Sequence, residues 1–144
     1  MPDYHVVKRS DIAGARTMFE RANLEPRARL HKTGSLFLSV LAMETLSKDA
    51  VEVLIEFDQQ AHTLQFTVPE SLPPGITVED CFHLQARKLK KSKRTSGVIA
   101  IKSLLDYIGF ARNGAMDFPV IRADAQKRSI TIALPADRFT LLRD

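Results

Sequence analysis

The sequence predicts an α+β, β-rich fold in which two tandem β-α-β-β units pack about a pseudo-twofold axis, preceded by an N-terminal helix. Short runs of alternating apolar and polar residues indicate strands. The same order of strand, helical turn, strand and strand occurs in residues 34–69 and again in residues 97–135. One copy of this length is too short to bury a sufficient core. We therefore expect both copies to pack together in a single compact domain, residues 1–144.

The first 33 residues are expected to hold a short strand, a helix and a basic lead-in. Ser10 and Asp11 offer an N-cap, and apolar residues recur at helical spacing after them. Pro26 ends this pattern because proline disrupts a helix interior. The helix is therefore placed at about residues 11–23, and the polar, basic stretch that follows leads into the first unit.

The first unit, residues 34–69, contains three alternating runs that predict strands at residues 36–40, 51–56 and 64–68. A turn or two of helix is expected directly after the first strand. Asp58 opens the polar turn between the last two strands, where an aspartate side chain stabilises the turn itself. This unit therefore reads as a strand, a short helix and a hairpin.

The segment 70–96 is expected to be a linker, because it holds Pro73-Pro74-Gly75, the clearest breaker in the chain. A shift of 63 positions then brings Gly34 onto Gly97. After an insertion of three residues the shift becomes 66, and Asp58 meets Asp124. The tail is residues 136–144. Two unrelated αβ segments with generic patterning remain the alternative.

The net charge of +4 is unevenly distributed along the 144 residues. Residues 1–33 carry +3, residues 34–80 carry −7 and residues 81–144 carry +8. The apolar runs are too short for a membrane span, and the N-terminus lacks the apolar centre of a signal peptide, so we expect a cytoplasmic protein with no membrane partner. The single cysteine, Cys81, excludes an internal disulfide.

The basic stretches that precede the two units are the best functional lead. Such a surface binds phosphate backbones through counterion release. No aromatic residue lies between Arg87 and Arg94, so duplex or backbone binding fits better than base stacking. The alternative is a solvated linker whose lysines aid solubility. The candidate nucleic-acid-binding residues are Arg27, Arg29, Lys32, Arg87, Lys88, Lys90, Lys91, Lys93 and Arg94.

Catalytic patterns are not found in the sequence. No phosphate-binding glycine loop and no pairing of a nucleophile with a base is visible. Cys81 and His83 have strand spacing but would need two further ligands to hold zinc, so a buried cysteine beside a histidine is the preferred interpretation. We expect a non-enzymatic protein with no cofactor and no metal.

The order of elements resembles the AbrB-like swapped-hairpin DNA-binding module. The matching residues are Gly34-Ser35-Leu36-Phe37-Leu38, Leu46, Val51-Glu52-Val53 and Leu64-Gln65-Phe66. In that family two such units from two subunits interdigitate into one small barrel that binds DNA. The resemblance implies a fused pseudo-dimer acting as a small DNA-binding transcriptional regulator or accessory protein. A second resemblance, to the PC4-like single-strand-binding fold, rests on curved strands, a basic segment and pseudo-dimeric symmetry.

A protein-interaction scaffold is the rival hypothesis. The acidic first copy of one molecule would dock on the basic second copy of another, which predicts a homo-oligomer. Nucleic acid, with DNA preferred over RNA, is the partner that the first hypothesis predicts.

Overall fold

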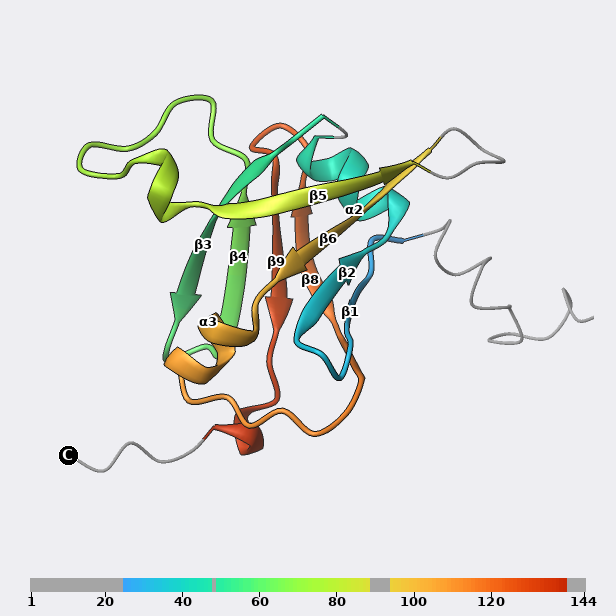
Figure 1. Ribbon diagram of the computed structural model, residues 1–144, viewed down its shortest axis with the longest axis vertical. Coiled ribbons are helices and arrows are strands. Elements are labelled where there is room, and N and C mark those ends of the chain that lie inside the picture. The colour runs from blue at the N-terminus through green and yellow to red at the C-terminus, as the bar shows by residue number, and fades with distance from the viewer. Residues whose placement is uncertain (1–24, 48, 89–93, 140–144) are drawn as a thin grey trace, which may run out of the picture.

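The computed structural model describes residues 25–47, 49–88 and 94–139, which form a mostly β structure (Figure 1). The strands join in one nine-stranded sheet whose order is β7-β1-β2-β6-β5-β3-β4-β9-β8, with every pairing antiparallel. The strands are β1 (Ala28–Leu30), β2 (Ser35–Leu38), β3 (Glu52–Asp58), β4 (Thr63–Thr67), β5 (Phe82–Lys88), β6 (Thr95–Ala100), β7 (Met116–Phe118), β8 (Val120–Asp124) and β9 (Ser129–Ala133). The helices described are α2 (Val40–Leu46) and α3 (Lys102–Tyr107), with single 3₁₀ turns η2 (Val78–Asp80) and η3 (Ala136–Arg138).

The two ends of the sheet meet at Pro119. Strands β7 and β8 are the outermost strands of the sheet order, yet only this proline separates them in the chain. One bent segment therefore pairs with β1 on one side and with β9 on the other. Proline has no N–H to donate, and its carbonyl accepts from Ala133 N at 2.9 Å. The sheet thus curls into a near-barrel, in which few strand edges stay unpaired.

The core fills the inside of this curled sheet. Inward-facing residues alternate with outward-facing ones along β2 and β4, as the burial pattern of each strand shows. Helix α2 begins at Ser39, whose hydroxyl accepts from Ala42 N at 3.3 Å. The inward side chains that are fully buried include Leu30, Leu36, Leu38, Met43, Leu46, Leu64, Phe66, Leu84, Ile99, Ile101, Leu105 and Ile130.

The predicted fold class is wrong. The structure is mostly β, in one continuous antiparallel sheet with two short helices among the described residues, and it does not divide into two β-α-β-β units about a pseudo-twofold axis. The expected linker, 70–96, supplies β5, which lies between β6 and β3. The first predicted unit has one strand, β3, at a place where the second predicted unit has two, β7 and β8. These two strands lie at opposite ends of the sheet order.

The physical reason is that the basic segments can also form strands. Leu84 and Ala86 alternate with polar residues in β5, and Ala28 and Leu30 alternate with arginines in β1. Their backbones complete a sheet that neither unit closes alone. The N-terminal helix expected at residues 11–23 lies outside the described residues. No helix in the described part of the chain has the length and apolar character needed to cross a membrane.

Candidate nucleic-acid interface

Four strands, β1, β2, β6 and β5, form the half of the near-barrel that faces the viewer in Figure 1. Their pairing aligns outward-facing residues in a row: Arg29 pairs with Phe37, Phe37 with Val98, and Val98 with Gln85. Arg87 lies two residues beyond Gln85 and so faces the same side. We call this outward surface, with Arg27, Arg29 and Arg87, the basic face.

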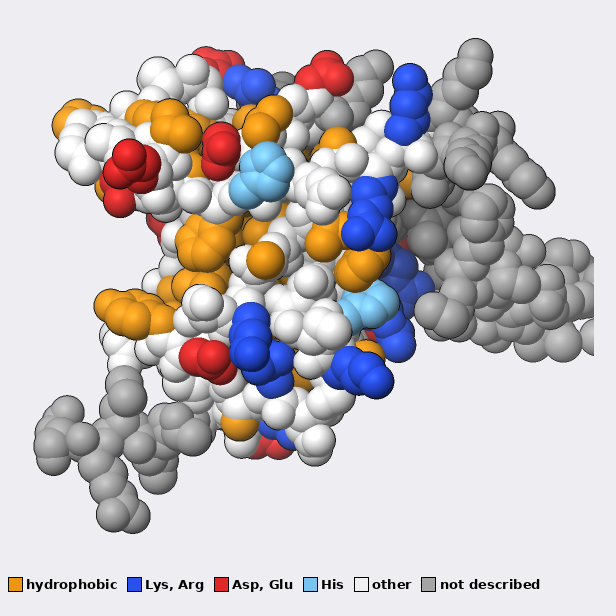
Figure 2. Space-filling view, in the orientation of Figure 1, with side chains coloured by type: hydrophobic (Ala, Val, Ile, Leu, Met, Phe, Trp, Pro, Cys, Tyr) orange, Lys and Arg blue, Asp and Glu red, His pale blue; other side chains and the backbone are white. Residues whose placement is uncertain are grey.

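The charge of these four strands has one sign. They contain Arg29, Arg87 and Lys88 and no aspartate or glutamate. Strand β3, by contrast, carries Glu52, Glu56 and Asp58. Figure 2 shows Lys and Arg side chains gathered on the right-hand part of this view. The near-barrel therefore has a basic half beside an acidic strand, which favours approach of a polyanion from one side.

Phe37 lies at the centre of the basic face. The guanidinium carbon of Arg87 is 5.4 Å from the centroid of its ring. The His31 ring lies on another side, with centroids 4.0 Å apart and planes tilted by 43°. A cation–π contact at an exposed site is worth about 0.5–1 kcal/mol, so it orients Arg87 without fixing it. Aromatic, imidazole and guanidinium groups therefore form one cluster across β1, β2 and β5.

A hollow of about 250 Å³ opens beside the Phe37 ring. Leu38, Ser39 and Ser96 contribute to its walls, and Arg29 and Asp117 lie at its margin. Most of its lining is apolar, although it lies on the outer side of the sheet. The complete lining is Arg27, Arg29, Phe37, Leu38, Ser39, Ser96 and Asp117. We call this feature the Phe37 hollow.

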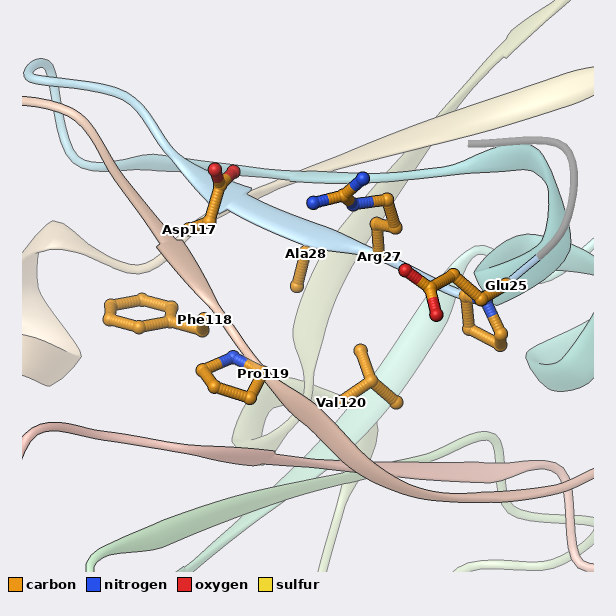
Figure 3. A pocket seen from close by; sticks show the side chains of 8 residues that line it. Glu25, Arg27, Ala28, Asp117, Phe118, Pro119 and Val120 are labelled. Carbon is orange, nitrogen blue, oxygen red and sulfur yellow. The ribbon is translucent and has the colours of Figure 1, made fainter. Parts of the chain in front are cut away.

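A second hollow, of about 330 Å³, lies at the closure of the sheet between β1 and the β7–β8 segment (Figure 3). Phe118, Pro119 and Val120 lie on one side of it, whereas the side chains of Arg27 and Asp117 extend to the other. Arg27 therefore lines both hollows. This second hollow has Glu25 at its margin, which disfavours an anion there.

Two of the predicted arginines already have carboxylate partners. Arg29 Nη1 lies 3.3 Å from Asp117 Oδ1, and Arg94 Nη2 lies 3.2 Å from Glu44 Oε1. Both pairs are partly exposed, so each contributes little free energy and is screened by salt. For Arg87, no carboxylate of the described chain lies within ion-pair distance. Arg87 is therefore not ion-paired within the described part of the chain.

The structure brings three of the predicted residues onto one face and separates the others. Arg27 and Arg29 lie on or beside β1, and Arg87 lies on β5, across the intervening strands β2 and β6. Lys88 follows Arg87 in β5 and therefore has the opposite orientation. Three interstrand spacings separate β1 from β5, or about 14 Å. Lys32 is exposed at the β1–β2 turn, where its carbonyl accepts from Arg112 at 3.3 Å. Residues Lys90, Lys91 and Lys93 lie outside the described residues.

Phe37, which lies at the centre of the basic face, is not among the candidate binding residues that the sequence predicts. It is far from the basic run in sequence, and its alternation with Leu36 and Leu38 reads simply as strand β2. One feature of the sequence could have pointed to Phe37. It lies on the face of β2 opposite the buried leucines, and a polar residue is expected there if that face meets water. Only the pairing of β1, β2, β6 and β5 places this ring between arginines.

Cys81 and His83 form no metal site with their neighbours. The Cys81 thiol donates to the Thr77 carbonyl at 3.8 Å, and His83 Nδ1 lies 3.9 Å from Glu52 Oε1. Burial raises the pKa of the Cys81 thiol, and the negative charges of Glu52 and Asp80 raise it further. Within the described ranges, no three histidine, cysteine, aspartate or glutamate side chains gather so as to hold a metal ion.

Comparisons with protein-family models, with curated proteins and with solved structures find no match to this chain. The case for a function therefore depends on the residues of the site.

Proposed function

We propose that this protein is a non-enzymatic nucleic-acid-binding protein that contacts phosphates through the basic face, as a small DNA-binding regulator or accessory protein does. The observation that carries the proposal is the alignment of Arg29 on β1 and Arg87 on β5 on one side of four strands that hold no carboxylate. Arginine donates to phosphate through a planar fork, which makes it well suited to this contact.

The strength of such binding comes from counterion release. Each phosphate that is neutralised releases condensed cations, so affinity falls steeply with salt. Arg27 and Arg87 provide the charge, and Arg29 joins them once its weak pair with Asp117 opens. We therefore expect measurable binding at low salt and a strong loss at moderate salt.

Fluorescence anisotropy with a labelled DNA tests the proposal. The full chain is titrated into duplex and single-stranded DNA at low and at moderate salt. Saturable binding at low salt that weakens as salt rises supports the proposal. The absence of binding to both DNAs at low salt contradicts it.

A second candidate function is self-association through opposite charges. Glu56 and Asp58 are exposed on β3, and no ion pair joins either of them to another described residue. The acidic strand of one molecule could meet the basic face of another, as in a scaffold. Light scattering across a salt series tests this, because a mass that falls from oligomer to monomer with rising salt is expected. A monomeric mass at every salt concentration contradicts it.

A further inference from the structure

We propose that the Phe37 hollow receives an unpaired base of a single-stranded nucleic acid, with the sugar–phosphate backbone lying across the arginines of the basic face. This inference rests on the proposed function, because it names the class of nucleic acid that the same face binds. The chemistry recognised is an aromatic base next to a phosphate, which single-stranded DNA and RNA share.

Phe37 occupies an unusual position for an aromatic side chain. Water-facing sides of antiparallel sheets normally carry polar residues, yet this ring is half-buried at the middle of the outward row between Arg29 and Val98. Every base presents a π-face, so an aromatic side chain on a sheet surface offers a stacking partner that tolerates any sequence. The Phe37 ring lines a hollow of about 250 Å³, and a flat group bound in that hollow would contact the ring.

Arginine side chains surround the Phe37 hollow. Arg27 and Arg29 line it directly, and Arg87 lies over the Phe37 ring from the β5 side. A base that packs against the ring brings its own phosphates within reach of these guanidinium groups. Asp117 and Arg29 at the margin have side chains that are 52 % and 43 % exposed, so an acceptor and a donor are accessible to the edges of a base.

The Phe37 hollow favours single strands over duplexes. In a duplex the bases are stacked and paired, and only their edges reach the grooves. A hollow in a sheet surface can receive a base only if that base is unpaired or is extruded from the helix at a free-energy cost. Duplex phosphates can still contact the arginines. Phe37 should therefore contribute to single-strand binding alone, whereas the arginines contribute to both.

Substitution of Phe37 tests this distinction. Phe37→Leu keeps an apolar side chain but removes the ring, and Phe37→Tyr keeps the ring. We expect Phe37→Leu to weaken binding of single-stranded DNA and RNA roughly tenfold, as loss of one base–aromatic stack does, while binding of duplex DNA stays unchanged. Phe37→Tyr should bind both as the original chain does. Tyr107→Leu is the matched control, because Tyr107 is 88 % exposed on α3, outside the sheet.

A fluorescent reporter makes the test independent of affinity. The chain has no tryptophan, so Phe37→Trp places a unique indole at the hollow. Single-stranded oligonucleotides should quench its emission through stacking, and duplex DNA should not. If the emission of Phe37→Trp changes with protein concentration and not with added nucleic acid, a second copy of the chain occupies the hollow. That result would overturn the inference.

The outcomes distinguish this inference from the proposed function. The base-binding role is overturned if three results occur together: duplex and single strands bind with equal affinity, Phe37→Leu does not change either affinity, and Phe37→Trp shows no quenching. Phosphate binding would then remain intact. No binding to any nucleic acid at low salt overturns both. Thermal melting of each variant shows that it is folded, and if Phe37→Leu does not fold, the quenching of Phe37→Trp decides.

Discussion

The guanidinium carbon of Arg87 on β5 lies 5.4 Å from the centroid of the Phe37 ring on β2, across the intervening strand β6. The contact joins a residue of the expected linker to a residue of the first predicted unit. It places a cation beside an aromatic ring on the outward side of the sheet, and the first prediction concerns that cation.

Removing two charges of the basic face should weaken binding of every nucleic acid. In the double variant Arg27→Gln/Arg87→Gln, two phosphate contacts are lost. The slope of log K against log salt should then become shallower by about 2 for duplex DNA. Anisotropy over a salt series measures this slope. Arg122→Gln/Lys127→Gln removes the same charge from β8 and the β8–β9 turn, and an equal loss there would show that only net charge matters.

Breaking the pair between Arg29 and Asp117 should strengthen binding. Asp117→Asn removes a negative charge at the margin of the basic face and releases Arg29 Nη1, now 3.3 Å from the carboxylate. We expect a rise in affinity of a few-fold at low salt that disappears at high salt. The pair is exposed and worth about 0–1 kcal/mol, so the melting temperature should change little. A lower affinity would show that Asp117 contacts the ligand itself.

Gly97 should not tolerate a side chain. A Cβ built at this position overlaps Met43 Sδ and lies 3.1 Å from Leu84 Cδ1, in the packed contact between α2 and β6. We expect Gly97→Ala to lower the free energy of unfolding by about 1–3 kcal/mol, measured by urea denaturation. Met43→Ala combined with Gly97→Ala should cost less than the sum of the two single variants, because the sulfur no longer occupies the space.

Two aspartates should stabilise the hairpin turns. Asp58 Oδ1 accepts from Gln60 N and Ala61 N, each at 3.0 Å. Asp124 Oδ1 accepts from the N–H groups of the second and third residues after it, at 3.0 and 3.1 Å. Replacing either aspartate by alanine should lower stability by about 1 kcal/mol, whereas asparagine should retain most of it. Equal melting temperatures for the alanine and asparagine variants would contradict this role.

Alkylation of Cys81 should be slower in the folded chain than in the unfolded chain at the same pH. Its pKa lies above the ordinary value of 9.0, so at mildly alkaline pH the folded chain holds less thiolate than the unfolded chain. Iodoacetamide should therefore react more slowly with the folded protein than with protein in urea at the same pH. Glu52→Gln removes one negative charge near the thiol and should speed the reaction. An unchanged rate in that variant would show that Glu52 does not contribute to the raised pKa.

The alternation of apolar and polar residues is a local pattern, so it predicted several strands at the places where they are observed. The runs at residues 36–40, 51–56 and 64–68 match β2, β3 and β4 closely. The turn role of Asp58 was also predictable, because an aspartate bonds to backbone groups two and three residues ahead. Period-two alternation and turn chemistry involve only neighbours in the chain, so they are visible before any fold is known.

The basic segments were misread for the same reason. The high charge of β5 and the nearby breaker at residues 73–75 favoured a linker. In the structure, Leu84 of this segment faces inward and is buried. Whether such a segment becomes a strand depends on finding unpaired strand edges elsewhere in the chain. Here β6 and β3 supply those edges.

The sequence by itself therefore determined which residues form several of the strands and turns, where the charge is concentrated and which faces of those strands are apolar. The tertiary structure alone decided the order of strands, the closure at Pro119 and the position of Phe37 between Arg29 and Arg87. The reason is that strand pairing uses backbone N–H and C=O groups that are alike in nearly every residue. Local pattern creates the strands, and packing of the whole core selects which of them become neighbours.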